Sequence, residues 1–207
     1  MANRGSGGMG FGSVPPVVKN LLILNGLVFL AQYVFKQQGI QLENWGALWP
    51  IGTPYFKVWQ LITYQFMHGG VTHILFNMFT LWMFGSILEN FWGNKRFLTF
   101  YLLCGIFAGI AQLIMQPNGV ALGASGAIMG LMAAFAYLFP NTELFLMFIP
   151  IPVKAKYVIP GLMALDIFGS IAPQQGDNVA HWAHLGGALA GLIIVIIWNK
   201  TNRKKFY

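Results

Sequence analysis

The chain contains no charged residue between Phe97 and Thr142. A helix that crosses a bilayer needs about 20 consecutive, mostly apolar residues, and this run holds two such segments separated by the polar turn "QPNG". Composition extends the argument to the rest of the chain, because 57% of the 207 residues are hydrophobic and only 8% are charged. Such a chain is too apolar for an ordinary soluble domain, so we expect a membrane protein with several spanning helices.

Turn signals and charged residues divide the chain into six apolar segments. The predicted fold class is therefore all-α, a bundle of six transmembrane helices near residues 18–38, 70–91, 95–114, 124–140, 156–172 and 181–199. The connection between the first two helices is long and rich in Trp, Tyr, Gly and Pro. Because amphipathic aromatic side chains favour the membrane interface, we expect this connection to be an interfacial loop.

The termini are predicted to be short tails on one membrane domain. Residues 1–16 are rich in Gly and Ser and should be disordered, residues 17–199 should form the membrane domain, and residues 200–207 should form a basic tail.

With the N-terminus in the cytoplasm, only Lys36 and Lys57 of the 12 Lys and Arg residues fall outside, so both termini are expected to be cytoplasmic. This topology fits a bacterial inner membrane, with an organelle membrane as the alternative. The net charge of +7 forms no basic stripe interleaved with aromatic residues, so no nucleic-acid partner is expected.

Four polar residues should share one depth in this topology. His73 and Asn77 lie early in the second predicted helix, Ser125 opens the fourth, and His184 lies in the first turn of the sixth. These three helices run in the same direction, and their first two turns lie within about 10 Å of the outer boundary. Polar groups at membrane depth are costly unless they pair or line a water-filled cavity, so the cluster is a candidate functional site.

Serine and histidine at one depth predict nucleophilic catalysis. An imidazole can take the proton of a serine hydroxyl and later return it to a leaving amine. The backbone N–H of Ser125, at a helix N-terminus, could donate to the resulting oxyanion, together with His73 and Asn77 on one helix face. Gly123 and Gly126 would let another backbone approach the serine closely.

Each of these residues also has a structural interpretation. Ser125 could cap its helix, Asn77 could bond across helices, and the G-x-x-x-G of Gly126 and Gly130 suits tight helix contact. His68 and His181 are interpreted as ordinary hydrogen-bonding residues. The conjunction of the four polar residues at one depth favours a catalytic site.

Three motifs together resemble those of the rhomboid intramembrane serine proteases. They are "HILFN" from His73 to Asn77, "GASGAIMG" from Gly123 to Gly130, and "AHLGGALAG" from Ala183 to Gly191. The likeness covers about 17–198 and includes the six-helix plan and the long first loop. It implies Ser125 as nucleophile, His184 as general base, and His73 and Asn77 as the oxyanion-binding pair. It further implies that Gly123 precedes the nucleophile motif and that the sixth helix packs on the fourth through Gly187 and Gly191.

The resemblance implies an endopeptidase that cleaves single-span membrane proteins near the outer boundary through an acyl-enzyme, without a metal or other cofactor. The family works with a Ser-His dyad, so Asp166 in the fifth predicted helix is interpreted as a buried, hydrogen-bonded carboxylate and not as a third member. One departure is Gln60, which follows Trp59 where many relatives carry Arg. A charge that could anchor the first loop is missing there.

Alternatives from other classes stay open. A metal-dependent protease could use His181 and His184 with His73 or His68, although the chain has no H-E-x-x-H motif and few carboxylates. A proteolytically silent rhomboid-like protein could instead bind membrane helices, although such relatives generally lose the serine or the histidine. A transporter would usually show internal repeats and more charge within the membrane.

Overall fold

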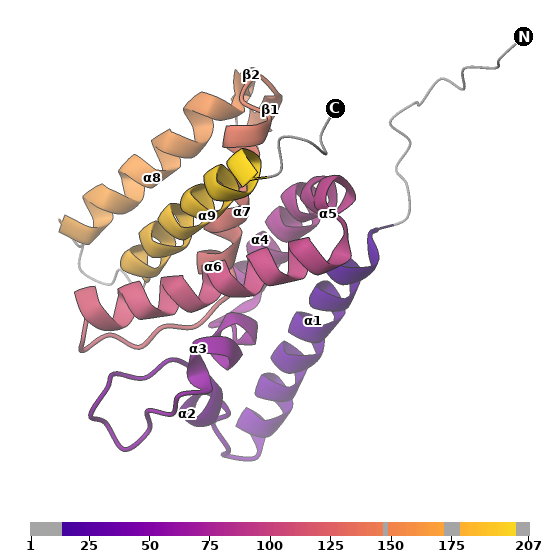
Figure 1. Cartoon of the computed structure of the whole chain (residues 1–207). Coiled ribbons are helices and arrows are strands. Elements are labelled where there is room, and N and C mark those ends of the chain that lie inside the picture. The colour runs from indigo at the N-terminus through magenta and orange to yellow at the C-terminus, as the bar shows by residue number, and fades with distance from the viewer. Residues whose placement is uncertain (1–13, 147–148, 172–178, 202–207) are drawn as a thin grey trace, which may run out of the picture.

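The computed structural model describes residues 14–146, 149–171 and 179–201, which form a mostly helical bundle (Figure 1). Residues 1–13 of the predicted disordered tail and residues 202–207 of the predicted basic tail lie outside the described residues, whereas Pro16 already belongs to the first helix. In the described part, four helical stretches are long and apolar enough to cross a membrane. They are α1 (Pro16–Gln37), α4 to α5 (Val71–Trp92), α6 (Asn94–Met115) and α9 (His181–Thr201).

The two remaining predicted spans are shorter. The helix α7 (Ser125–Leu138) has 14 residues and α8 (Ala155–Ile171) has 17, so the count of six spans stays a prediction. Every residue of α7 from Gly126 to Phe135 is buried, because α6, α8 and α9 pack around it. A helix enclosed by other helices does not need a full membrane length of lipid-facing surface.

The second long stretch is one helix with an irregular turn. The helix α4 (Val71–Thr80) continues through the π-helical turn η2 (Leu81–Gly85) into α5 (Ser86–Trp92). The carboxylate of Glu89 is almost fully buried and accepts hydrogen bonds from the backbone N–H groups of Val17 (2.9 Å) and Val18 (2.7 Å). It thereby caps the first turn of α1, where unpaired N–H groups and the helix dipole favour an anion.

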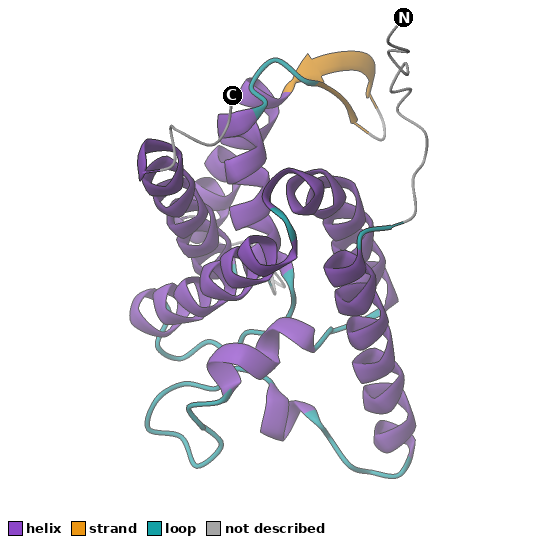
Figure 2. Ribbon diagram, turned by 45° about the vertical axis from the view of Figure 1, so that its right-hand side comes forward, coloured by secondary structure: helices purple, strands orange, loops and turns teal. Residues whose placement is uncertain are grey.

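The described chain is mostly helical, as the sequence predicts, and the connection between α7 and α8 is an exception. The strands β1 (Glu143–Leu146) and β2 (Ile149–Lys154) form an antiparallel hairpin there, drawn in orange in Figure 2. The segment "IPIPVK" cannot continue a helix, because its two prolines lack N–H donors and clash with the preceding turn, while its β-branched residues favour a strand. Glu143 stands opposite Lys154 in the register, a pairing of opposite charges that supports the alignment.

The predicted long loop between α1 and α4 contains three short helices. These are α2 (Glu43–Gly46), α3 (Gln60–Thr63) and the 3₁₀ turn η1 (Tyr64–Phe66). Trp45 and Trp59 are exposed in this segment. Its location at a membrane interface stays a prediction.

Gln60, which stands where the resemblance would lead us to expect Arg, bonds to the backbone of this segment at several points. Its side chain is fully buried, and its Oε1 accepts from the backbone N–H groups of Trp49 and Lys57, both at 3.2 Å. Its Nε2 donates to the carbonyl oxygen of Tyr55 at 2.8 Å. An arginine has no acceptor and could not make the first two bonds, so a neutral amide anchors the loop in this chain.

Glycines bring α7 and α9 into backbone contact. A Cβ added at Gly187 of α9 would collide with the carbonyl oxygen of Gly126, and one added at Gly191 would lie 2.5 Å from the carbonyl oxygen of Gly130. The resemblance implies packing of this kind for Gly187 and Gly191, and the G-x-x-x-G of Gly126 and Gly130 suits it. The first half of α9 is thereby held against the first two turns of α7.

We expect Gly187→Ala and Gly191→Ala to lower the free energy of unfolding by about 1–3 kcal/mol each, because the new methyl group meets rigid backbone. The matched control is Gly161→Ala on α8, where an added Cβ has no atom within 4 Å. This control should be neutral or slightly stabilising, because alanine favours the helix. Thermal unfolding in detergent measures the difference, and equal melting temperatures for all three variants would contradict the packing argument.

Candidate active site

Ser125 and His184 are in hydrogen-bond contact. The Nε2 of His184 lies 2.8 Å from the Oγ of Ser125, although the residues are 59 positions apart in sequence. Ser125 is the first residue of α7, and His184 lies in the first turn of α9. The close packing of these two helices brings the pair together. Neither side chain is exposed, so the contact is partly shielded from solvent.

The backbone before Ser125 requires a glycine. Gly123 has φ +126°, a conformation that other residues rarely adopt, and its N–H donates to the carbonyl oxygen of Tyr64 at 2.9 Å. A Cβ at Gly123 would also lie 2.7 Å from Cε1 of His73. Glycine therefore permits both the turn and the approach of the His73 ring.

His73 presents a donor beside Ser125. The backbone N–H of Gly69 donates to Nδ1 of His73 at 3.3 Å, so in the neutral ring Nδ1 is the acceptor and Nε2 carries the proton. A Cβ built at Gly123 would lie 2.8 Å from this Nε2 and 3.7 Å from the Oγ of Ser125. The protonated nitrogen of His73 and the serine hydroxyl therefore border the same small space.

Asn77 follows one helical turn after His73 on the same face of α4. Its side chain is only 6% exposed, and its Nδ2 has no hydrogen-bond partner among the described residues. A buried amide donor without a partner costs free energy. Such a donor suits a site where a negatively charged oxygen forms transiently.

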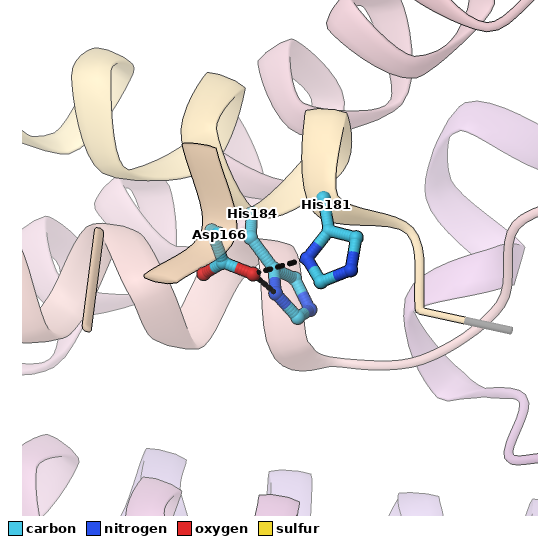
Figure 3. A group of neighbouring side chains, drawn as sticks. All are labelled: Asp166, His181 and His184. Carbon is cyan, nitrogen blue, oxygen red and sulfur yellow. Dashed lines mark hydrogen bonds and ion pairs between the residues drawn. The ribbon is translucent and has the colours of Figure 1, made fainter. Parts of the chain in front are cut away.

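Asp166 of α8 joins the site from the far side of His184. Its Oδ1 lies 3.0 Å from Nδ1 of His184 and 2.7 Å from Nδ1 of His181 (Figure 3). Only 9% of the residue is exposed, which agrees with the interpretation of a buried, hydrogen-bonded carboxylate. The sequence did not predict that this carboxylate contacts His181 and His184. The signal available was the common depth of Asp166 and the H-x-x-H of α9.

The metal alternative can be compared with the same geometry. That alternative named His73 or His68 as the third ligand beside His181 and His184. Within the described residues, the possible ligand atoms that lie within 4.8 Å of one another belong instead to Asp166, His181 and His184, so the third ligand would be a carboxylate. His68 packs instead against His73, with ring centroids 5.1 Å apart. Burial and the neighbouring His73 lower the pKa of His68 to about 4, so this ring is neutral near pH 7.

The fold and the site define an α-helical membrane protein in which a serine and a histidine meet at the facing ends of two packed helices. A model of the Rhomboid domain matches residues 55–200, which is more than half of the chain. The chain therefore belongs to the rhomboid family, and the resemblance seen in the motifs is confirmed.

Relatives occur in bacteria and in organelles. The chain is 28% identical over 194 residues to "Putative rhomboid protease YdcA" of Bacillus subtilis (strain 168), and the match covers 92% of each chain. It is 33% identical over 197 residues to "Presenilin-associated rhomboid-like protein, mitochondrial" of Mus musculus, which covers 89% of this chain and 50% of the relative. It is 33% identical over 152 residues to the protein named "Presenilin-associated rhomboid-like protein A, mitochondrial" of Danio rerio, covering 69% of this chain and 39% of the relative. The chain thus spans half or less of these mitochondrial relatives.

Proposed function

We propose that this protein is an intramembrane serine endopeptidase that cleaves single-span membrane proteins near the outer membrane boundary. The observation that carries the proposal is the 2.8 Å contact between His184 Nε2 and Ser125 Oγ. Family membership supports it, and so does the name of the Bacillus subtilis relative, whose whole length this chain nearly matches.

In the proposed reaction, the Oγ of Ser125 attacks the carbonyl carbon of the scissile peptide, and its proton passes to Nε2 of His184. The imidazolium then gives this proton to the amine of the leaving segment as the C–N bond breaks, which leaves an ester on Ser125. Water then gives a proton to His184 and attacks the ester carbon. The bond between this carbon and Oγ of Ser125 breaks, the proton returns from His184 to Oγ, and the N-terminal fragment leaves with a new carboxyl group. No metal or other cofactor takes part.

The oxyanion of each tetrahedral intermediate needs donors that are already in place. We assign this role to Nε2 of His73, Nδ2 of Asn77 and the backbone N–H of Ser125. Two features support the assignment: the Gly69 contact that leaves the His73 proton on Nε2, and the absence of a partner for Asn77 Nδ2 within the described residues.

The location is part of the proposal. We place both termini in the cytoplasm, because that orientation puts most Lys and Arg residues on the inner side. The extensive match to a Bacillus subtilis protein supports a bacterial inner (cell) membrane, whereas other relatives are named as mitochondrial or chloroplastic.

Labelling of the purified protein with a fluorophosphonate tests the proposal. The reagent phosphonylates an activated serine, so wild type should be labelled on Ser125 and Ser125→Ala should not. Ser86→Ala, which removes a hydroxyl in another helix, is the control and should be labelled like wild type. An unlabelled, folded wild type would favour the alternative of a silent rhomboid-like protein that binds membrane helices.

Chelation separates the serine mechanism from the metal alternative. If Asp166, His181 and His184 hold no catalytic metal, cleavage of a model substrate should continue at an unchanged rate after exhaustive treatment with a chelator. The measurement is the initial rate before and after treatment, with zinc added back in a third sample. Loss of activity that zinc restores would favour a metalloprotease.

A further inference from the structure

We propose that Asp166 is a positioning residue for His184, held in place by His181, and that the site therefore works as a line of three side chains, Ser125, His184 and Asp166. The proposal rests on the proposed serine protease function and adds a member to its dyad. It is carried by the two contacts of one carboxylate oxygen with two imidazole rings (Figure 3).

The carboxylate selects the useful tautomer of His184. An ionised carboxylate only accepts hydrogen bonds, so the contact of 3.0 Å with Oδ1 requires the proton of the neutral ring to be on Nδ1. The Nε2 lone pair then faces the hydroxyl of Ser125, as a general base must. Without Asp166 the proton could equally occupy Nε2, and that form of His184 would be a donor to Ser125 and not a base. The carboxylate also stabilises the imidazolium that forms when the serine gives up its proton.

His181 holds the carboxylate from a second direction. Its Nδ1 lies 2.7 Å from the same Oδ1, and the planes of the two histidine rings are 81° apart. The backbone of α8 is shaped for this ring, because a Cβ added at Gly169 would collide with the imidazole of His181. Gly169 lies one turn beyond Asp166, so the same face of α8 presents the carboxylate and the space for the ring.

The cost of burying the carboxylate argues against an incidental contact. A carboxylate removed from water is strongly destabilised unless donors satisfy its oxygens, and only 11% of the Asp166 side chain is exposed. In the described part of the chain, this carboxylate contacts two histidines of α9, one of which contacts Ser125. The buried charge is thus directed at the proposed base.

The test compares Asp166→Asn with Asp166→Glu, His181→Ala and the control Ser170→Ala. The Ser170 hydroxyl donates to the backbone carbonyl of Asp166 at 2.8 Å, so its removal disturbs the same turn of α8 and leaves the carboxylate intact. For each full-length variant, the rate of fluorophosphonate labelling, kcat and KM for a model substrate, and the melting temperature are measured.

Asp166→Asn should lower kcat and the labelling rate by about tenfold or more, with KM within about twofold, because the loss lies in the base and not in substrate binding. Asp166→Glu should recover part of this loss. His181→Ala should lose part of the rate, but less than Asp166→Asn, because the carboxylate keeps its contact with His184 and loses only the ring that holds it. Ser170→Ala should behave as wild type.

Wild-type kcat and labelling in Asp166→Asn, with an active wild type, would overturn the positioning role and leave the serine protease function standing. A lower melting temperature with unchanged kcat would assign Asp166 to packing alone, which also overturns the proposal.

If Asp166→Asn does not fold, Asp166→Glu decides, since a folded variant with full activity despite a displaced carboxylate contradicts positioning. A wild type that is never labelled removes the underlying function as well, and labelling abolished by a chelator and restored by zinc would make the three residues metal ligands.

Discussion

Ser125→Ala is expected to abolish cleavage of a single-span model substrate while leaving the melting temperature close to that of wild type. The hydroxyl is the proposed nucleophile, and its removal deletes one small group at the start of α7 without changing the glycine contacts with α9. His184→Ala should lose cleavage to a similar degree, because a serine without its base is a poor nucleophile.

The double variant Ser125→Ala with His184→Ala gives the sharper measurement. Residues that act as a unit show losses that do not add, so the double variant should cleave no more slowly than either single variant. Rates are compared by quantifying the cleaved fragment over long incubations. Wild-type cleavage by folded Ser125→Ala would end the serine protease proposal.

His73→Ala and Asn77→Ala are each expected to lower kcat by about 10²–10³, with little change in the apparent affinity for substrate. Their donors would stabilise charge that develops only in the transition state, so substrate binding does not use them. Neither variant should equal the loss in Ser125→Ala, because the other side chain and the backbone N–H of Ser125 remain.

The matched control for this pair is Leu75→Ala. Leu75 lies on the same helix, α4, and its side chain is 63% exposed. It should keep wild-type kcat. Full activity in both His73→Ala and Asn77→Ala would assign these residues to packing and leave the oxyanion with other donors.

The helical segments were predictable because their signals are local. Apolar runs interrupted by Gly, Pro and charged residues placed the first, second, third and sixth helices within about two residues of α1, α4 to α5, α6 and α9. No structure was predicted for residues 141–155, between the fourth and fifth predicted helices, so the hairpin of "ELFL" and "IPIPVK" is a finding of the structure. The π-helical turn at Leu81–Gly85 has no comparable signal, since it adds one residue to a helical turn of unchanged composition.

The site was predictable only in part. Depth along three parallel helices was enough to group His73, Asn77, Ser125 and His184, and the structure brings Ser125 and His184 into contact. Depth does not say which way a side chain points around its helix. The contacts of Asp166 depend on the rotation of α8 and on the space that Gly169 leaves, and neither follows from apolar periodicity.

The shortness of α7 has a consequence for the supply of water. Its 14 residues extend about 21 Å, whereas the hydrocarbon core of a bilayer is about 30 Å thick. If the Leu138 end of α7 lies at one edge of the hydrocarbon layer, Ser125 lies about 9 Å below the other edge. In the proposed reaction, hydrolysis of an ester on Ser125 consumes one water molecule per turnover, and that molecule would have to cross this distance. The second half of the proposed reaction would then depend on how fast water reaches Ser125 as well as on the chemistry of bond cleavage.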